Sequence, residues 1–234
     1  MLSAACSTVY FPQSLHHEDY QVKEQKVTDS TLVRLLSPYS SRLTASMNEV
    51  IGEVRGTLEK RQPEGSLGNL MADGMLYSAR KKFNRPVDAA VVNYGGVRLN
   101  EIPAGPLTLG KLYELSPFDN YIVLLEMKGS LLQEFLDHIA SRGGWPVAGM
   151  TMQIVNKKAR QVMISGKPLN SDALYTIALV DYVANGGDDS IMLKSLPQLN
   201  NGYLFRNELH EYLLQLKKEG RIITASTEGR VTNG

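Results

Sequence analysis

Two short apolar segments of this 234-residue chain each run directly into a polar loop that holds two adjacent glycines. Residues 87–92 lead into Asn-Tyr-Gly-Gly-Val-Arg at 93–98, and residues 175–180 lead into a loop with Asn-Gly-Gly-Asp at 185–188. Apolar runs of this length favour buried strands, and paired glycines permit positive φ and close backbone approach. Loops that follow buried strands gather at one edge of a sheet, where ligands commonly bind. The pattern therefore predicts a sheet domain with a binding edge.

Strand and helix patterns follow one another in irregular order along the rest of the chain. This order predicts a mixed α/β (α+β) fold, a single domain in which a mixed sheet is flanked by helices. Pro38 is expected to kink or break the first helix, and Ser66 is expected to be the N-cap of the second. The predicted strands cover residues 50–58, 87–92, 121–127, 150–155, 161–164 and 175–180, with a short one near Arg230, and the predicted helices begin near residues 29, 66, 108, 131 and 209.

The composition is that of an ordinary globular protein. Hydrophobic residues make up 43% and charged residues 21% of the chain, and the net charge is +1. Such a balance argues against a broad basic surface, so nucleic acid is not expected as a partner. Apolar runs fall short of the ~20 residues that span a bilayer. The single cysteine excludes an internal disulfide framework.

Residues 1–27 carry no sustained period and are predicted to be a tether that precedes a domain at 28–234. The opening Met-Leu-Ser-Ala-Ala-Cys resembles the end of a bacterial lipoprotein signal, which makes Cys6 a lipidation candidate. The alternative, an N-terminus with an incidental cysteine, stays open. A lipid anchor would place the protein in the periplasm or at the cell surface of a bacterium and would be its link to a membrane. His16 and His17 point apart as neighbours, which favours a solvated arm over a metal site.

Several side chains around the glycine-bearing loops suit a nucleoside. Two aromatic residues in loops can hold a planar base, because stacking contributes ~1–3 kcal/mol per base. A carboxylate accepts hydrogen bonds from ribose hydroxyls, and a guanidinium offers forked donors to phosphate oxygens. Each residue alone is typical of a turn, a surface or the end of a core, whereas the set has the parts of a nucleotide site. The candidates are Asn93, Arg98, Phe118, Tyr182, Asn185 and Asp188.

Six segments, taken in chain order, resemble the C-terminal substrate domain of the 5'-nucleotidase family, whose members hydrolyse nucleotides and nucleotide sugars. They extend over about residues 45–232, so the resemblance covers most of the chain. The segments are Leu-Gly-Asn-Leu at 67–70, Asn-Tyr-Gly-Gly-Val-Arg at 93–98, Ser-Pro-Phe at 116–118, Met-Lys-Gly-Ser at 127–130, Tyr-Val-Ala-Asn-Gly-Gly-Asp at 182–188 and Thr-Glu-Gly-Arg-Val at 227–231.

The resemblance implies a phosphate end and a nucleoside end for the site. Arg98 matches an arginine that contacts the substrate phosphate, and Arg61 matches a second one through the length of its loop. Asn93 matches an asparagine that contacts the nucleoside. Phe118 and Tyr182 match the pair of aromatics that sandwich the base, with tyrosine where phenylalanine is common.

Asp188 matches the family's aspartate that accepts from the ribose hydroxyls. Two neighbours depart from the family pattern, since Tyr94 stands where a small residue is usual and Asp189 where glycine is common. Both departures leave the preferred base or leaving group open.

The family's hydrolysis uses an N-terminal metallophosphatase domain with two divalent metal ions. Its histidine motifs do not occur around the four histidines of this sequence, of which His138 and His210 are expected to be structural. The resemblance therefore implies a substrate-binding half with no catalytic residue and no cofactor of its own. The divalent metals are expected in a separate metallophosphatase chain, and whether this chain counts as an enzyme stays open. Two alternatives are a non-catalytic nucleoside- or nucleotide-binding surface protein and a degenerate structural module. A neighbouring gene for a metallophosphatase would favour the substrate-binding half of a two-chain enzyme over a binding protein without a partner.

Overall fold

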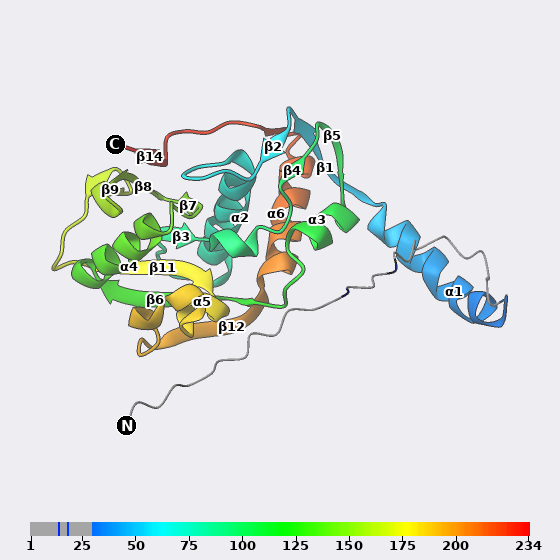
Figure 1. Ribbon diagram of the computed structural model, residues 1–234, viewed down its shortest axis with the longest axis horizontal. Helices are drawn as coiled ribbons and strands as arrows, with labels where there is room; N and C mark the ends of the chain where they lie inside the picture. Colours follow the sequence, from blue (N-terminus) through cyan, green and yellow to red (C-terminus); the bar gives the residue numbers. More distant parts are fainter. Residues whose placement is uncertain (1–13, 15–17, 19–29) are drawn as a thin grey trace, which may run out of the picture. The chain divides into compact units, whose positions relative to one another are not determined.

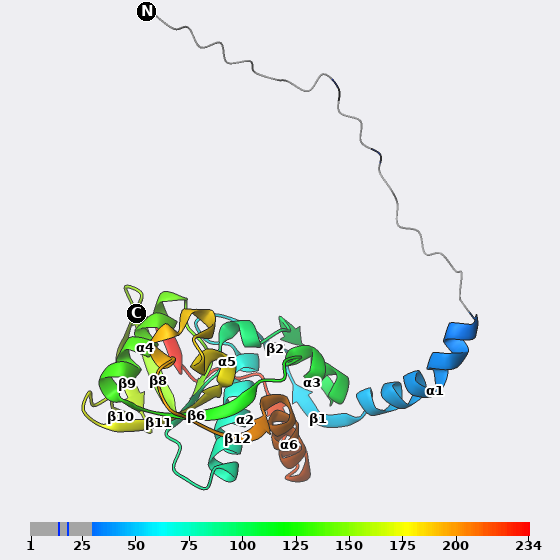
Figure 2. The same cartoon turned by 90° about the horizontal axis from the view of Figure 1, so that it is seen from below.

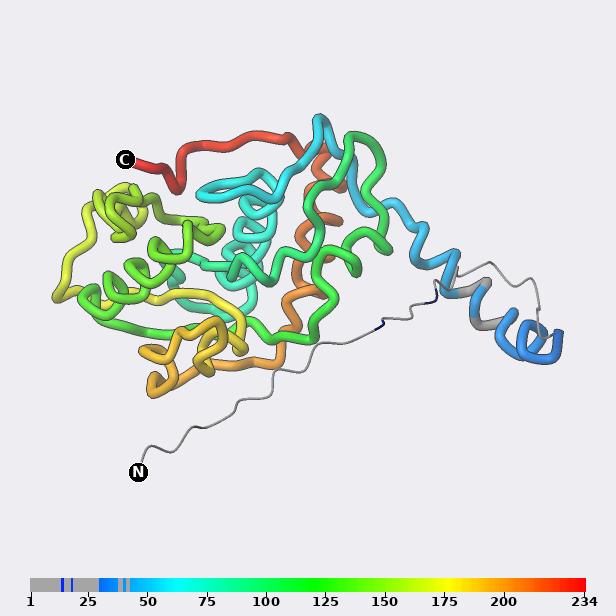
Figure 3. Tube along the Cα trace, in the orientation of Figure 1, coloured from blue at the N-terminus to red at the C-terminus, as the bar shows by residue number. Residues whose placement is uncertain are grey.

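The computed structural model describes Ser14, Glu18 and residues 30–234 (Figure 3). The chain divides into two units, residues 1–40 and 41–234. Cys6, His16 and His17 lie outside the described residues, and so does most of the predicted tether. Among the described helices, none combines the length and the apolar character needed to cross a membrane. The candidate binding site belongs entirely to residues 41–234.

The first helix, α1, covers Ser30–Met47. Its start agrees with the helix expected from Asp29. Of the kink or break expected at Pro38, the break is wrong, because the helix continues across position 38. Proline removes one backbone donor, and the remaining helical hydrogen bonds can continue on either side of it. Leu32, Leu35 and Leu36, which were expected to supply an apolar face, are 52%, 65% and 51% exposed.

The main sheet is mixed and has the strand order β12-β6-β11-β3-β7. In both views of the ribbon, β12, β6 and β11 lie side by side (Figures 1 and 2). The central strand β11 runs antiparallel to β6 and parallel to β3. The predicted mixed α/β fold is confirmed. The strands are β3 at Ala89–Val91, β6 at Tyr121–Lys128, β7 at Val147–Ala148, β11 at Leu174–Val180 and β12 at Gln198–Leu204.

Helices cover this sheet and build the core with it. The core combines fully buried side chains such as Met71 and Phe135 with the strand residues Leu125 and Ile177. Both α2 and α4 pack against the main sheet, and α6 packs on α2. The helices are α2 at Ser66–Lys82, α3 at Leu109–Leu115, α4 at Gly129–Ser141, α5 at Asp181–Ala184 and α6 at Phe205–Lys218, with 3₁₀ turns at Tyr94–Gly96, Gly187–Asp189 and Ile191–Leu193.

Two helix starts differ by one residue from the prediction, each for a hydrogen-bonding reason. Gly65 is the N-cap of α2, and Ser66 is already helical because its hydroxyl accepts a hydrogen bond from the Glu59 amide at 3.0 Å. Thr108 is itself an N-cap, and its hydroxyl accepts from the Lys111 amide at 3.3 Å. A short polar side chain at a helix start thus has two possible partners, and the tertiary structure decides between them.

The strand predicted over residues 50–58 is divided by a turn. Gly56 has a φ of 80°, so the chain changes direction there and forms two strands. The first joins a three-stranded sheet in the order β13-β1-β5, and the second pairs with β4. These strands are β1 at Val50–Arg55, β2 at Leu58–Glu59, β4 at Glu101–Ile102, β5 at Gly105–Thr108 and β13 at Ile223–Thr224.

The predicted hairpin is present with a shorter loop. Asn156 and Lys157 both have positive φ, which builds a two-residue turn and starts the second strand three residues earlier than expected. A further sheet results, in the order β10-β9-β8-β14. Its strands are β8 at Met150–Val155, β9 at Lys158–Ile164, β10 at Lys167–Pro168 and β14 at Val231–Asn233.

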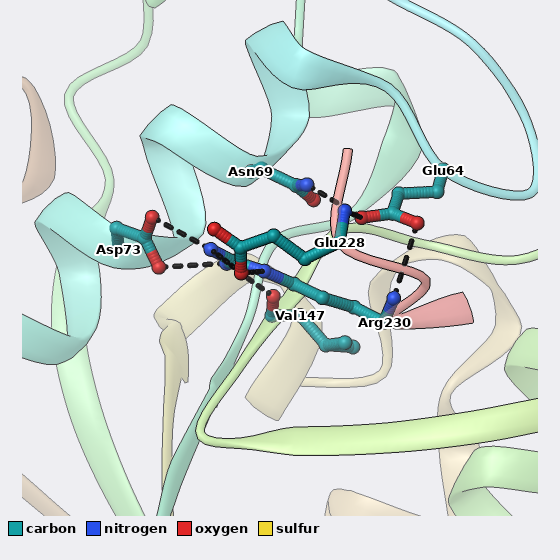
Figure 4. Close-up of polar contacts among 6 residues, drawn as sticks. All are labelled: Glu64, Asn69, Asp73, Val147, Glu228 and Arg230. Atoms are coloured by element: carbon teal, nitrogen blue, oxygen red, sulfur yellow. Dashed lines mark hydrogen bonds and ion pairs between the residues drawn. The ribbon is translucent and has the colours of Figure 1, made fainter. Parts of the chain in front are cut away.

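The closing Thr-Glu-Gly-Arg-Val segment ties β14 to α2 (Figure 4). Arg230 donates to both carboxylate oxygens of Asp73, at 2.6 and 2.9 Å, and to the Val147 carbonyl at 3.1 Å. Glu64 accepts from the amides of Glu228 and Arg230 and from the Asn69 side chain. Burial would lower the pKa of Arg230, but its bonds and charge pairs with Asp73 and Glu228 raise it instead. This segment therefore has a structural role.

Replacing Arg230 with methionine is expected to lower the free energy of unfolding by about 1–2 kcal/mol, because a charged hydrogen-bonded pair is lost. This value is at the lower end of the range for a charged hydrogen bond, because Asp73 is 38% exposed and its charge is partly screened by solvent. Urea denaturation measures it. Arg221→Met is the matched control, because Arg221 is exposed and its contact to Glu219 is 3.5 Å long. Equal stability of the two variants would show that the Arg230 contacts do not stabilise the fold.

Candidate ligand-binding site

Three loops meet at one edge of the main sheet. The parallel strands β3 and β11 send the loops after residues 91 and 180 to the same side. β6 is antiparallel to β11 and pairs Ile122 with Val180, so the loop before β6 reaches that side too. These loops enclose a pocket of about 360 Å³. Its lining consists of Asn93, Gly95, Gly96, Arg98, Phe118, Asn120, Tyr182 and Asp188.

Asn93 is the buried anchor of the first loop. Only 6% of the residue is exposed, and its side-chain amide donates to Asp188 Oδ2 at 2.6 Å, which joins two loops 95 residues apart. Gly96 makes room for it, since a Cβ there would lie 2.7 Å from Asn93 Oδ1. The first glycine pair therefore provides space for a side chain, and neither Gly95 nor Gly96 has positive φ.

The second glycine pair shapes the Tyr182 side of the pocket. Gly186 has a φ of 92°, the left-handed conformation expected for such a loop. At position 187 a glycine is required for lack of space, because a Cβ there would lie 2.5 Å from Cε1 and Cζ of the Tyr182 ring. Tyr182 itself is 47% exposed toward the pocket. Thus a glycine at 187 is needed for the aromatic ring to lie beside the loop.

Asp188 is a half-buried carboxylate at the pocket wall. Its Oδ2 accepts from Asn93, and its Oδ1 accepts from the Tyr182 hydroxyl at 3.3 Å. The two oxygens of an ionised carboxylate offer about four acceptor positions. Asp188 therefore keeps acceptor capacity for a ligand hydroxyl.

Arg98 and Phe118 form the other end of the pocket. The guanidinium carbon lies 5.5 Å from the centroid of the Phe118 ring, and Nη1 has a long contact of 3.5 Å to the Gly95 carbonyl. Phe118 is 41% exposed. Within residues 30–234, Arg98 forms no ion pair with a carboxylate. Its donors are thus available to an anion.

Lys60 adds a second positive charge beside Arg98. Its ammonium donates to the Val97 carbonyl at 2.8 Å and lies 4.2 Å from the centroid of the Tyr94 ring. Burial, followed by the charge of Arg98, lowers the pKa of Lys60. Tyr94, the unusual residue of this loop, therefore packs on Lys60. This lysine was not among the predicted site residues, and its local sequence carries no motif that would single it out.

Arg206, a residue of α6, holds the loop that carries Phe118 through hydrogen bonds to its backbone. It donates to the carbonyls of Ser116 and Phe118 at 3.4 and 3.3 Å and pairs with Asp119 at 2.5 Å. Its guanidinium also stacks on Tyr113 at 4.5 Å. The helical position of Arg206 within α6 gave no hint of this contact, which depends on how α6 packs.

Two predicted residues lie outside the pocket lining. Arg61 is exposed and pairs with Glu59 at 3.5 Å, and Asn185 accepts from Gln198 at 3.0 Å. Asn120 lines the pocket although it was not among the candidates. Its place in the polar loop two residues after Phe118 was the available signal.

No histidine, cysteine, aspartate or glutamate cluster in the described part of the chain is arranged to hold a metal ion. His138 is half-buried and its Nε2 lies 2.9 Å from the Asp188 carbonyl. His210 is partly buried in α6. The pocket thus offers aromatic surfaces, a carboxylate, two amides and a guanidinium, which are groups that bind a polar ring compound with an anionic end.

Comparisons with known proteins agree on one family. Residues 44–195 match the family described as 5'-nucleotidase, C-terminal domain. The chain is 31% identical over 196 residues to the 5'-nucleotidase of Vibrio vulnificus, covering 79% of this chain and 34% of that protein. It is 29% identical over 203 residues to the 5'-nucleotidase of Vibrio parahaemolyticus, covering 82% and 35%.

A solved structure shows the same relationship. The 5'-nucleotidase precursor from Thermus thermophilus superimposes with a TM-score of 0.74 at 28% identity, covering 88% of this chain and 43% of that one. The chain spans about a third of the length of the Vibrio relatives. The match includes the three loops of the pocket, and the chain belongs to the 5'-nucleotidase C-terminal domain family.

Proposed function

We propose that this domain binds a nucleotide or nucleoside as the substrate-recognition half of a 5'-nucleotidase. The observation that carries the proposal is one pocket with two exposed aromatic rings, a carboxylate with free acceptor positions and a guanidinium without a carboxylate partner among the described residues. The 5'-nucleotidases among the relatives support the same substrate class.

The two ends of the pocket suit the two ends of a nucleotide. Phe118 and Tyr182 offer ring faces to the base, and stacking on each contributes ~1–3 kcal/mol. Asp188 would accept from the ribose hydroxyls, while the amides of Asn93 and Asn120 can both donate and accept at the nucleoside. Arg98 would bind the phosphate, with Lys60 adding positive charge beside it. Arg61 and Asn185 stay predictions from the sequence, since neither lines the pocket.

Hydrolysis requires, in this proposal, a dimetal metallophosphatase half supplied by a separate chain, which holds the divalent metals. The described residues provide no metal-binding group that could replace it. A surface protein that binds nucleosides without such a partner is the alternative. An export location with a lipid on Cys6 stays a prediction from the sequence.

Asp188→Asn tests the nucleoside end. The new amide can accept from Asn93 through its oxygen, which turns its NH₂ group toward the ribose in place of an acceptor. Adenosine is expected to bind about tenfold or more weakly, within the ~1.5–3 kcal/mol of a charged hydrogen bond, while 2',3'-dideoxyadenosine changes little. Titration calorimetry measures both ligands.

Asp172→Asn, an exposed aspartate outside the pocket lining, is the matched control for this experiment. Equal losses for both ligands, accompanied by a lower melting temperature, would assign Asp188 to the fold. If wild-type protein binds neither adenosine nor AMP, the proposed function is wrong.

The chain alone is expected to release phosphate from AMP more slowly than the usual enzymatic range, which begins at ~1 s⁻¹. The reason is that hydrolysis of this kind needs a metal-activated water, and the described residues contain no cluster of three or more histidine, cysteine, aspartate or glutamate side chains that could hold the metal ion. Phosphate release with added Mn²⁺, Zn²⁺ or Mg²⁺ measures it, with a known 5'-nucleotidase as positive control. Turnover of ~1 s⁻¹ or faster would contradict the division of labour between two chains.

A further inference from the structure

Asp188 and Asp189 both adopt the left-handed backbone conformation, with φ of 50° and 58°. Such a conformation is unfavourable for a residue with a side chain and persists where surrounding contacts enforce it. The same pair of conformations at Asn156 and Lys157 belongs to a hairpin turn between paired strands, whereas Asp188 and Asp189 lie in a 3₁₀ turn between short helices, so other contacts must hold this loop. The loop matters because it aims the Asp188 carboxylate into the pocket.

The C-terminal end of α4 supplies the external contacts. His138 Nε2 lies 2.9 Å from the Asp188 carbonyl oxygen, and the Arg142 guanidinium pairs with the Asp189 carboxylate. His138 and Arg142 are four residues apart, so they project from the same side of the helix end. Two consecutive loop residues are thus held by two side chains of one element.

The ring of His138 is well placed to hold its partner. It packs edge-on against Trp145, which is 2% exposed, with ring centroids 6.0 Å apart and planes at 87°. A carbonyl oxygen only accepts, so Nε2 carries the proton in this contact. The buried tryptophan therefore fixes the imidazole, and the imidazole fixes the Asp188 backbone.

We propose that His138 and Arg142 are positioning residues that orient the Asp188 carboxylate toward the ribose of the ligand. This inference rests on the proposed function, because it assigns a purpose to the geometry of that site. Asp189 stands where glycine would adopt the same φ without strain. Its carboxylate compensates by engaging Arg142, so this pair belongs to the particular loop of this chain.

The experiment measures two ratios of binding affinity in four variants. One ratio compares adenosine with 2',3'-dideoxyadenosine, and the other compares AMP with adenosine. His138→Ala and Arg142→Gln are each expected to lower the preference for adenosine over dideoxyadenosine by about three- to tenfold, as one hydrogen bond or ion pair that aims the carboxylate is lost. The preference for AMP over adenosine should stay unchanged, because Arg98 lies on another loop. Should His138→Ala fail to fold, His138→Gln with its shorter, amide-based donor replaces it and is expected to lower the preference less.

Asp189→Gly and the double variant Asp189→Gly/Arg142→Gln test the ion pair. Glycine adopts the left-handed conformation freely, so Asp189→Gly should keep the ribose preference. Arg142→Gln should then have no further effect in that background. Glu134→Ala, an exposed position on α4 one turn before His138, is the matched control.

The outcomes distinguish a failure of the proposed function from a failure of the positioning role of His138 and Arg142. Wild-type protein that binds neither adenosine nor AMP would overturn the proposed function. Wild-type protein that binds adenosine and dideoxyadenosine equally well would overturn the positioning role, because Asp188 would then not recognise the ribose hydroxyls. A wild-type preference that survives in both His138→Ala and Arg142→Gln would overturn the positioning role alone. Equal losses of binding for adenosine, AMP and dideoxyadenosine, together with a lower melting temperature, would also overturn it, since that pattern indicates general destabilisation.

Discussion

Replacing Arg98 with alanine is expected to remove most of the advantage that AMP has over adenosine, while adenosine itself binds as before. A guanidinium that forms a bidentate contact to phosphate contributes charged hydrogen bonds of about 1.5–3 kcal/mol each. The expected loss for AMP is about 2–4 kcal/mol, or about 30- to 1,000-fold in Kd. The Arg98 side chain makes a long contact to Gly95, lies over the face of Phe118 and is repelled by the charge of Lys60, so its removal should affect the fold little.

Calorimetry with the two ligands measures this difference directly. Arg98→Lys should lie between wild type and Arg98→Ala, because lysine keeps the charge but loses the planar fork of donors. Arg85→Ala, a surface arginine paired with Glu126, is the control for removing a positive charge. If Arg98→Ala weakens AMP and adenosine equally, Arg98 acts through Phe118 and the phosphate assignment is wrong.

The double variant Phe118→Ala/Tyr182→Ala is expected to lose about 2–6 kcal/mol of binding for adenosine and AMP alike, the sum of two stacking contributions. The two rings lie on different loops of the pocket and are 41% and 47% exposed, so they contribute little to the core that holds the fold. Each single variant should lose about half of that amount.

Calorimetry with both ligands, together with thermal unfolding, tests this expectation. Tyr121→Ala removes a ring of similar exposure, 38%, that is outside the pocket lining. It should leave adenosine binding unchanged. Single variants that bind adenosine as tightly as wild type would show that the rings merely cap the core.

The main parts of the fold and pocket could be predicted because they depend on local patterns. Apolar runs indicated β6 and β11, and the polar loops after β3 and β11 were expected to share a sheet edge, which the parallel pairing of these strands explains. β12 was missed because its Gln-Leu-Asn-Asn-Gly-Tyr-Leu sequence has no apolar alternation and pairs at the sheet edge. Its place depends on the neighbouring strand β6.

Side-chain partners across long sequence distances could not be predicted in the same way. Lys60 reaches Val97, and Arg206 reaches the Phe118 carbonyl from a helix 88 residues later. The paired glycines were expected to permit positive φ and close approach; Gly186 has positive φ, whereas Gly96 and Gly187 make room for Asn93 and Tyr182. Nothing in the local sequence separates these two reasons for a glycine.

The tie between Arg230 and α2 has a consequence for how the domain is made. Asp73 and Arg230 are 157 residues apart, and β14 pairs in parallel with β8 nearly 80 residues before it. Contacts between such distant parts form late and slow the search for the native topology. During synthesis, α2 and β8 must wait for their partners until Arg230 has left the ribosome. From the synthesis of β8 until β14 follows, the nascent domain therefore has an open sheet edge at β8, which exposes unpaired backbone groups to other chains and to chaperones.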